Sequence, residues 1–457
     1  MKKDNNKMNR RTFLKTFSLG SASVLGLIAL EPLNCLARNT RKPEPDKTEN
    51  NMTYRVNHHT GDKVSLLGYG MMRLPMNGGT INQDLVNQEV DYAIAHGVNY
   101  FDTAPVYCGG RSEAATGIAL SRHPREKYLI ATKMSNFDQQ LWALDKAKEM
   151  YENSFKELKV DHIDYYLLHS VGGGGMETLK KRFIDNGLLD FLLAERKKGR
   201  IRNLGFSYHG DVEVYDWLVD HQDEYQWDFC QIEMNYVDWR HASKGGRGRK
   251  QDADAEYLYA KAEKAGIQNV VMEPLLGGRL ARVPEEFAKM LKEQRPDHSI
   301  ASWAFRWVGT YTNILVTLSG MTTMEVLQEN VKTFSPLDPC SNSEKDLLAR
   351  IADGMSGYPT IPCTACRYCM PCPYGVDIPG NFTYYNEAVN KKLLPLPAKD
   401  APEYAARLKE YRDGFQAALP EGARADQCMD CEECLPKCPQ QIRIPNQMGR
   451  LVELVSR

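Results

Sequence analysis

Residues 128–168 read YLIATKMSNFDQQLWALDKAKEMYENSFKELKVDHIDYYLL and contain one complete strand–helix–strand unit. The runs Tyr128–Thr132 and Ile163–Leu168 are short and apolar, as strands buried on both faces are. The stretch Leu141–Leu158 between them repeats apolar residues at helical spacing. This order predicts two parallel strands that are joined by a crossover helix.

The same unit recurs along the middle of the chain. Further strands are expected at Leu67–Met72, Val98–Asp102, Ile201–Ser207, Asp228–Glu233, Gln268–Glu273 and Ile314–Ser319. Further helices are expected at Asn82–His96, Gly187–Lys198 and Ala253–Ala265. Strands that alternate with helices over about 270 residues predict an α/β fold, a (β/α)8 TIM barrel. An open, doubly wound sheet is the alternative, but no G-x-G-x-x-G follows the first strand.

Two runs of cysteines near the C-terminus indicate a second, metal-binding part of the chain. The first run is Cys363, Cys366, Cys369 and Cys372, and the second is Cys428, Cys431, Cys434 and Cys438. The last Cys of each run is followed by Pro. This spacing is typical of ferredoxins with two [4Fe–4S] clusters, in which the fourth Cys binds the other cluster. That pattern assigns one cluster to Cys363, Cys366, Cys369 and Cys438, and the other to Cys428, Cys431, Cys434 and Cys372.

One departure leaves the exchange of ligands open at Cys372. Two residues separate it from Cys369, where the bacterial pattern has three. Zinc and disulfides are the alternatives for the whole set. A structural zinc site usually has two separated cysteine pairs, and cysteines three apart on one loop bridge poorly to each other. We therefore expect a small, mainly α-helical, ferredoxin-like domain with two [4Fe–4S] clusters.

The N-terminus resembles an export signal. Arg10 and Arg11 are followed by Phe13-Leu14-Lys15 and by an apolar stretch too short to span a membrane. We expect residues 1–37 to be a twin-arginine signal peptide, which would place the protein in the bacterial periplasm, and residues 38–52 to be a linker. An uncleaved basic tail is the alternative. Lipidation at Cys35 is disfavoured because Asn34 precedes it.

Composition is that of an enzyme rather than of a nucleic-acid-binding or membrane protein. The chain has 457 residues, 42% apolar residues and a formal net charge of −1. That length allows two domains after a leader, and the charge gives no reason to expect nucleic acid as a partner. No stretch after the leader has the length and apolarity of a membrane span.

Four ionisable residues follow three successive expected strands. Asp102 ends one strand, with Tyr107 five residues later, Lys133 follows the next strand, and His169 follows the third. Active sites of (β/α)8 barrels lie where strands end, so these side chains can converge. A Lys beside a Tyr lowers the pKa of the phenol, and an Asp can pair with that Lys. Tyr107 is therefore the candidate proton donor, and His169 can orient a carbonyl group.

These stretches make the sequence similar to the aldo-keto reductase superfamily. The matching segments are Asn99–Tyr107, Ser112-Glu113, Ala131–Lys133, Leu167–His169, Lys198–Ser207, Gln231–Tyr236 and Gln328–Asn330. With the two cysteine runs, the chain resembles the branch with a C-terminal 4Fe–4S dicluster domain. The resemblance implies that Asp102, Tyr107, Lys133 and His169 are catalytic. It also implies a barrel at residues 53–335 and a cluster domain at residues 336–457.

The resemblance further implies a nicotinamide cofactor, NAD(P)(H). Ser207 and Gln231 would contact its carboxamide, and Gly320, Glu329 and Asn330 would lie along its adenosine end. Three positions depart from the family: Tyr208, Met272 and Val326 stand where an Asn, an aromatic residue and an Arg are frequent. Since that Arg binds the 2′-phosphate of NADP, the choice between NAD and NADP stays open.

The leading hypothesis is an oxidoreductase that interconverts a small-molecule carbonyl and an alcohol. A hydride carries two electrons, whereas a cluster carries one. The clusters are therefore either structural or connected to a redox partner protein. The alternative hypothesis is an electron-transfer or assembly subunit with an aldo-keto reductase-like barrel.

Overall fold

The computed structural model describes residues 51–242, 253–394 and 403–456. The expected signal peptide at residues 1–37, and all but two residues of the expected linker at 38–52, lie outside the described residues. Within the described ranges, no helix has the length and apolarity needed to cross a membrane.

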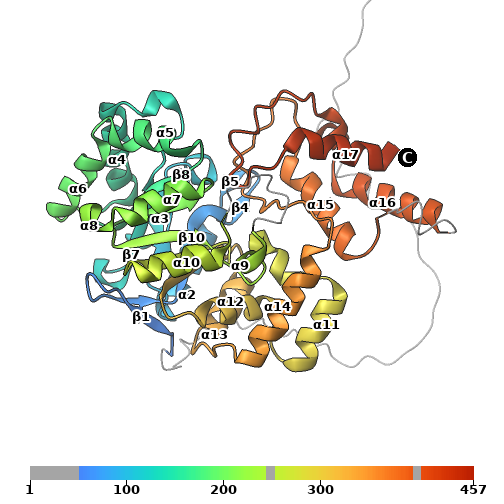
Figure 1. Ribbon diagram of the computed structural model, residues 1–457, viewed down its shortest axis with the longest axis horizontal. Coiled ribbons are helices and arrows are strands. Elements are labelled where there is room, and N and C mark those ends of the chain that lie inside the picture. The colour runs from blue at the N-terminus through green and yellow to red at the C-terminus, as the bar shows by residue number, and fades with distance from the viewer. Residues whose placement is uncertain (1–50, 243–252, 395–402, 457) are drawn as a thin grey trace, which may run out of the picture. The chain divides into compact units, whose positions relative to one another are not determined.

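Eight parallel strands close into a barrel (Figure 1) in the order β10-β11-β12-β3-β6-β7-β8-β9. They are β3 (Leu67–Gly70), β6 (Tyr100–Asp102), β7 (Leu129–Met134), β8 (Ile163–Gly172), β9 (Ile201–His209), β10 (Phe229–Glu233), β11 (Gln268–Met272) and β12 (Ile314–Ser319). The predicted (β/α)8 barrel is therefore confirmed, and the open sheet is wrong. Strands β8 and β9 extend past their predicted ends because they resume pairing beyond a register shift.

The interior of the barrel is a packed apolar core. Tyr100, Tyr165, Phe229, Val270 and Val316 are fully buried and contact one another inside the ring of strands. Two short hairpins accompany the barrel: β1 (Tyr54–Val56) with β2 (Lys63–Ser65), and β4 (Met76–Asn77) with β5 (Thr80–Ile81). Because the interior is filled, reactive groups have room only where the strands end.

Amphipathic helices follow the strands. In α4 (Leu144–Leu158), Ala147, Tyr151, Phe155 and Leu158 are buried, and this spacing forms one face of a helix. The other barrel helices are α2 (Gln83–Ala95), α3 (Ser112–Leu120), α6 (Leu188–Lys197), α7 (Val212–Asp220), α10 (Ala255–Lys264), α12 (Ile300–Gly309) and α13 (Met324–Thr333). Shorter or additional segments are α5 (Gly175–Leu179), α8 (Gln222–Tyr225), α9 (Asp238–His241) and α11 (Glu285–Gln294).

The boundary between the two domains differs from the one expected at residue 335. Helix α14 (Asn342–Ser356) buries Leu347, Leu348 and Ile351 in the hydrophobic core of the barrel. The helix therefore packs as part of the barrel, although we expected it in the cluster domain. An amphipathic helix looks the same in sequence whichever core receives its apolar face, so its spacing could not assign it.

The C-terminal region has a second hydrophobic core and is helical. It contains α15 (Ile378–Asn390), α16 (Tyr404–Ala418) and α17 (Ile444–Ser456), coloured orange to red in Figure 1. Phe382, Tyr411, Phe415 and Met448 from these helices are buried together. Six of the cysteines of the two runs contribute to or pack against the same core. The structure thus has the expected small, helical, cysteine-bearing domain.

Candidate active site

The four residues predicted to be catalytic meet where β6, β7 and β8 end. Asp102 is the last residue of β6, Lys133 lies in β7, His169 lies in β8, and Tyr107 begins the short helix η2 (Tyr107–Gly109). Asp102, Tyr107 and His169 line one cavity at this end of the barrel. Lys133 is fully buried beside them.

Lys133 and Asp102 form a buried ion pair. The Lys133 ammonium donates to Asp102 Oδ1 at 2.5 Å and to the Thr103 carbonyl oxygen at 2.8 Å. It also lies 4.8 Å from the centroid of the Tyr107 ring. Burial raises the pKa of Asp102 and lowers the pKa of Lys133, and their mutual attraction opposes both shifts. The pair stabilises each charge in a site that would otherwise disfavour it.

The pKa of Tyr107 differs from the expectation. The sequence suggested that Lys133 would lower it, whereas burial raises the pKa of Tyr107 well above 10. Nearby Tyr368 adds to that rise, and so does Asp102, because its negative charge would repel a phenolate. The Tyr107 hydroxyl therefore holds its proton in the free protein, as a proton donor must.

His169 is neutral and fixed in orientation. Burial lowers its pKa well below 6.5, and the positive charge of Lys133 lowers it further. Its Nδ1 lies 2.6 Å from the Ser135 hydroxyl. If Ser135 donates to Nδ1, the proton of the imidazole lies on Nε2, on the far side of the ring from Ser135. The His169 and Tyr107 rings meet edge to face, with centroids 5.8 Å apart.

Two residues that sequence reasoning missed hold His169 in place. One is Ser135, and the other is Arg182, in the π-helical turn η5 (Lys180–Ile184). Arg182 Nη2 donates to the His169 carbonyl oxygen at 3.1 Å and to Asn136 Oδ1 at 3.1 Å. No motif marked either residue, because each acts through a contact between distant segments of the chain.

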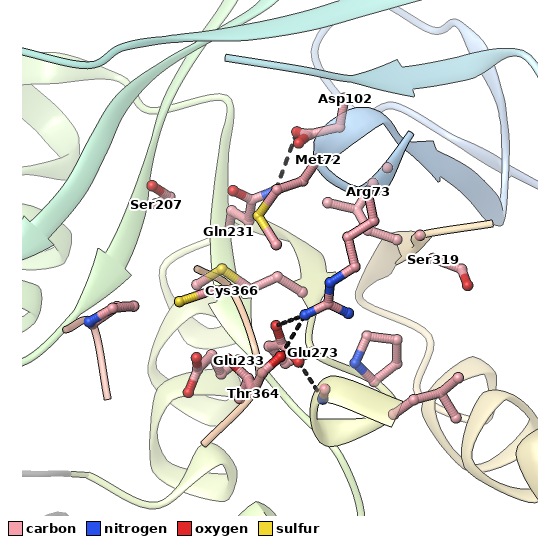
Figure 2. Close-up of a pocket in the computed structure, with 18 of the residues that line it drawn as sticks. Met72, Arg73, Asp102, Ser207, Gln231, Glu233, Glu273, Ser319, Thr364 and Cys366 are labelled. Atoms are coloured by element: carbon pink, nitrogen blue, oxygen red, sulfur yellow. Dashed lines mark hydrogen bonds and ion pairs between the residues drawn. The ribbon is translucent and has the colours of Figure 1, made fainter. Parts of the chain in front are cut away.

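Three of the five residues predicted to bind a cofactor line the same cavity. Ser207, Gln231 and Gly320 line it, and Gln231 Nε2 donates to Asp102 Oδ2 at 3.3 Å (Figure 2). Asn330 is buried behind the wall and donates to Ser319 Oγ at 3.0 Å. Glu329 is exposed and lies outside the lining of the cavity. Of this set, Glu329 lies outside the cavity, and Asn330 reaches it only through Ser319.

Arg73 and two glutamates also face this cavity. Arg73 extends between Thr364 and Glu273 (Figure 2), 2.6 Å from the Thr364 carbonyl oxygen and 3.7 Å from Glu273 Oε1. Burial raises the pKa of Glu273 to about 7, while Arg73 lowers it and Glu233 raises it. Glu273 is also in the left-handed region at φ 55°, which is unusual for a residue other than glycine. Left-handed residues of this kind cluster at functional sites.

The cysteine-rich domain supplies one wall of the cavity. Its lining includes Thr364, Cys366, Tyr368, Pro439 and Gln440. Gln440 Nε2 lies 2.5 Å from Glu233 Oε1, and the side chain of Tyr368 lies beside that of Tyr107. No sequence motif indicated this contact, because the two cysteine runs lie far from the barrel motifs along the chain.

The structure brings the eight cysteines together in two groups. Cys363, Cys366, Cys369 and Cys438, here the inner group, surround one cavity. Cys372, Cys428, Cys431 and Cys434, here the outer group, surround a second cavity, which Cys369 also borders. Cys366 of the inner group also lines the barrel cavity, whereas Cys431 of the outer group is exposed.

The arrangement suits clusters better than zinc or disulfides. All eight cysteines are free thiols, and no disulfide links them in the described chain. Within the described ranges, no three His, Cys, Asp or Glu side chains converge on the position of a single metal ion. A zinc ion needs its thiolates at about 2.3 Å, whereas a [4Fe–4S] cube spreads them around a larger volume.

Both groups use the same backbone turn. The residues on either side of Cys366, Ala365 and Arg367, have φ of 53° and 65°. The residues on either side of Cys431, Asp430 and Glu432, have φ of 54° and 62°. A left-handed residue thus flanks the central Cys on each side in both turns, and in the inner group Ala365 N donates to Cys363 Sγ at 3.4 Å. Such N–H···S contacts are typical of protein loops that surround iron–sulfur clusters.

Known proteins resemble both parts of the chain. Residues 66–348 match the Aldo/keto reductase family, and residues 362–442 match the 4Fe-4S dicluster domain. The protein tas of Escherichia coli is 33% identical over 195 residues, which cover 36% of this chain and 55% of tas. L-galactose dehydrogenase of Arabidopsis thaliana is 27% identical over 165 residues, which cover 35% of this chain and 50% of that enzyme. The chain thus spans about half the length of these curated relatives.

Solved structures share the fold. Aldo-keto reductase AKR11C1 of Bacillus halodurans, in its holo form, has a TM-score of 0.52 at 21% identity and covers 66% of this chain and 96% of its own. An aldo-keto reductase of Klebsiella pneumoniae in complex with NADPH has a TM-score of 0.52 at 19% identity, with the same coverage. The family match alone spans more than half of the chain. This protein therefore belongs to the aldo/keto reductase family of oxidoreductases and carries a 4Fe–4S dicluster domain C-terminal to the barrel.

Proposed function

We propose that this protein interconverts a small-molecule carbonyl and an alcohol with a nicotinamide cofactor, NAD(H) or NADP(H). The observation that carries the proposal is the meeting of Tyr107, His169 and the Asp102–Lys133 ion pair at one cavity. The bound nicotinamide would supply the hydride. The residues of the chain would supply the proton and the orientation of the substrate.

Each residue of the site has a role that follows from its surroundings. The Tyr107 hydroxyl, which keeps its proton in the buried site, would deliver it to the carbonyl oxygen. Neutral His169 would donate a hydrogen bond from Nε2 to the same oxygen, since Ser135 occupies Nδ1. The Lys133 ammonium, paired with Asp102, would attract the negative charge that forms on Tyr107 as the proton leaves.

We infer that an extended dinucleotide would lie along this cavity. Its lining runs from Tyr107 and His169, past Ser207 and Gln231, to Ser319 and Gly320. Arg73 lies on this path, and its positive charge could face a pyrophosphate. The same charge would offset the negative charges of Glu233 and Glu273. Val326 adds no cation at the position where relatives bind a 2′-phosphate. Titration of the protein with NADH and NADPH, followed by cofactor fluorescence, would decide between them.

We propose that the inner and outer groups each hold one [4Fe–4S] cluster. Support comes from the two cavities that the thiols surround, the repeated left-handed turns and the dicluster match. Anaerobically purified protein should then contain about eight iron atoms and about eight acid-labile sulfides per chain. Stoichiometric zinc without labile sulfide would contradict this proposal.

We also propose that the protein is exported folded to the periplasm, on the strength of the twin arginines Arg10 and Arg11. Clusters assembled in the cytoplasm would travel with the folded chain. Replacing both arginines by Lys should leave the protein in the cytoplasm with residues 1–37 still attached. Normal export of that variant would contradict the proposal.

The function itself is tested by Tyr107→Phe. A panel of aldehydes and ketones is screened with the wild type, and turnover of the best substrate is then compared with the variant. The variant keeps the ring and loses only the proton donor, so kcat should fall by about 10²–10⁴ while cofactor binding is retained. Full turnover by Tyr107→Phe, together with loss of turnover when a cluster is lost, would favour the electron-transfer alternative. The observation that favours this alternative is the position of Cys366 in the wall of the barrel cavity.

A further inference from the structure

The carboxylate of Glu273 lies between a cation and a backbone N–H group of the barrel cavity. Its Oε1 lies 3.7 Å from Arg73 Nη2 (Figure 2), and its Oε2 accepts from the Gly277 N–H at 2.5 Å. The side chain reaches Gly277 because the chain turns back sharply there: Glu273, Leu276 and Gly277 all have positive φ. The two oxygens of one carboxylate therefore meet two donor residues that both line the cavity.

These two donors are of the kind that proteins use to bind phosphate. A guanidinium matches the oxygens of a phosphate group, and backbone N–H groups in tight turns form concavities that bind anions. Arg73 donates to the Thr364 carbonyl oxygen at 2.6 Å, which fixes its head, and a guanidinium has five N–H donors in all. Gly277 has no side chain that would keep a phosphate away from its N–H. Glu273 thus occupies a site with the chemistry of an anion site.

The place of this site along the cavity suits a diphosphate. Arg73 packs beside Gly320, where a Cβ would lie 3.4 Å from Arg73 Cβ. Glu273 follows the end of β11, which pairs with β10, the strand that carries Gln231. In the proposed function, Gln231 would contact the carboxamide of the cofactor and Gly320 would lie along its adenosine end. The two phosphates that join these halves would therefore cross the site that Glu273 occupies.

We propose that Glu273 is a specificity-determining residue of the cofactor site: its carboxylate occupies the diphosphate subsite formed by Arg73 and Gly277, and a bound dinucleotide must displace it. No covalent bond changes in this exchange. A diphosphate carries more negative charge than a carboxylate and can replace it on both donors, whereas a ligand with a single carboxylate gains little over Glu273. The inference rests on the proposed function and adds a requirement for two phosphate groups.

The competing role for Glu273 is to hold Arg73 ready for the cofactor. In that role, removing the charge of Glu273 would let Arg73 move and would weaken cofactor binding. If Glu273 instead competes with the diphosphate, removing its charge frees Arg73 and the Gly277 N–H and strengthens binding. The two roles therefore predict changes of opposite sign in the dissociation constant of the cofactor.

The test compares Glu273→Gln with Glu233→Gln. Each variant removes one negative charge from the lining of the same cavity, but Glu233 meets Gln440 and His209, with its Oε1 2.5 Å from Gln440 Nε2. Dissociation constants for NADH and NADPH are measured by cofactor fluorescence at pH 8, above the pKa of Glu273, which is raised to about 7. In Glu273→Gln we expect them to fall about 10-fold, because a charged internal competitor is lost. In Glu233→Gln we expect a fall of about 2-fold, the effect of weaker long-range repulsion alone.

Two further measurements isolate the diphosphate. Inorganic pyrophosphate is titrated into the same proteins by calorimetry, and it should bind about 10-fold more tightly to Glu273→Gln than to the wild type. In a chain that carries Arg73→Met, adding Glu273→Gln should change the dissociation constant of NADH by less than about 3-fold, because the guanidinium for which both anions compete is gone. Iron and labile sulfide are measured first on every variant, so that only cluster-loaded chains are compared.

The outcomes separate this inference from the proposed function. Weaker binding of pyrophosphate and of the dinucleotides by Glu273→Gln, or equal gains in Glu273→Gln and Glu233→Gln, would overturn the inference and leave the function intact. A full 10-fold gain from Glu273→Gln in the chain that carries Arg73→Met would overturn it as well. Tighter pyrophosphate binding by Glu273→Gln, in protein that binds neither NADH nor NADPH, would support the anion site and contradict the proposed function.

Discussion

The inner and outer cysteine groups share a backbone turn and differ in their neighbours. Ala365 and Arg367 around Cys366, and Asp430 and Glu432 around Cys431, are all left-handed. Cys366 faces the barrel cavity, and the loop that carries it contacts Arg73 and Tyr107 through Thr364 and Tyr368. Cys431 is exposed to solvent. One repeated motif is thus placed in two settings, one beside the barrel cavity and the other at the surface.

This difference bears on why a two-electron enzyme would carry clusters. A hydride needs no one-electron carrier, so a cluster beside the active site can serve by holding the loop that completes the pocket. None of the cysteines of the outer group lines the barrel cavity. We therefore expect the barrel's activity to depend on the inner group far more than on the outer group.

The largest expected effect comes from removing one ligand of each group. Cys366→Ala should lose the inner cluster and release Thr364 and Tyr368, so barrel activity should fall on the order of 10²-fold, as displaced active-site groups do. Cys431→Ala should lose the outer cluster and leave carbonyl reduction close to wild type. Activity, iron content and cofactor binding are measured on both variants under anaerobic conditions. Equal loss of activity in the two variants would mean that the clusters act as one electron route.

A smaller effect tests the contact between the barrel and the inner loop. Gly277 packs on the backbone of Thr364, and a Cβ at Gly277 would lie 2.5 Å from Thr364 Cα. Its neighbour Gly278 is also left-handed but has nothing within 4 Å of a Cβ. Gly277→Ala should therefore lower the free energy of unfolding by about 1–3 kcal/mol more than Gly278→Ala does, since it adds overlap to the same backbone strain. Anaerobic denaturant unfolding measures the difference, and equal losses would show that the contact contributes nothing.

The smallest expected effect is a pH dependence from Glu273, the carboxylate beside the inner loop. Its pKa is raised to about 7 from an ordinary value of 4.5, so the folded state binds the proton more tightly than the unfolded state. This contribution to stability is complete below pH 4.5 and is lost as the pH rises through about 7. Relative to Glu273→Gln, the wild type should lose on the order of 1 kcal/mol between pH 6 and 8. Parallel stability curves for the two proteins over that range would exclude the effect.

The sequence predicted the barrel because its signals are local. Short apolar runs that alternate with amphipathic stretches located all eight strands, and ionisable residues at strand ends located Asp102, Tyr107, Lys133 and His169. The spacing of the cysteines indicated a cluster domain in the same way. Each of these signals lies within one short segment of the chain.

The features that could not be predicted from the sequence depend on contacts between distant segments of the chain. Tyr368 meets Tyr107 across 261 residues, and Arg73 meets Thr364 across 291. No local pattern encodes either contact. The pKa of Tyr107 was also predicted in the wrong direction. Burial raises it by more than Lys133 lowers it, and burial is a property of the folded pocket. Glu329 was expected beside a cofactor, yet its position on the helix turns it to solvent.

We propose that the barrel cavity performs hydride chemistry and that the cysteine groups do not pass electrons to the substrate. The most direct test is a turnover with nicotinamide cofactor carrying deuterium at both C4 positions, in ordinary water, with the best carbonyl substrate from the screen. Mass spectrometry of the alcohol then locates the label. Hydride transfer in the barrel cavity predicts one deuterium on the carbinol carbon of each product molecule. A product whose carbinol hydrogen comes from water would contradict it and point to electrons delivered through the clusters.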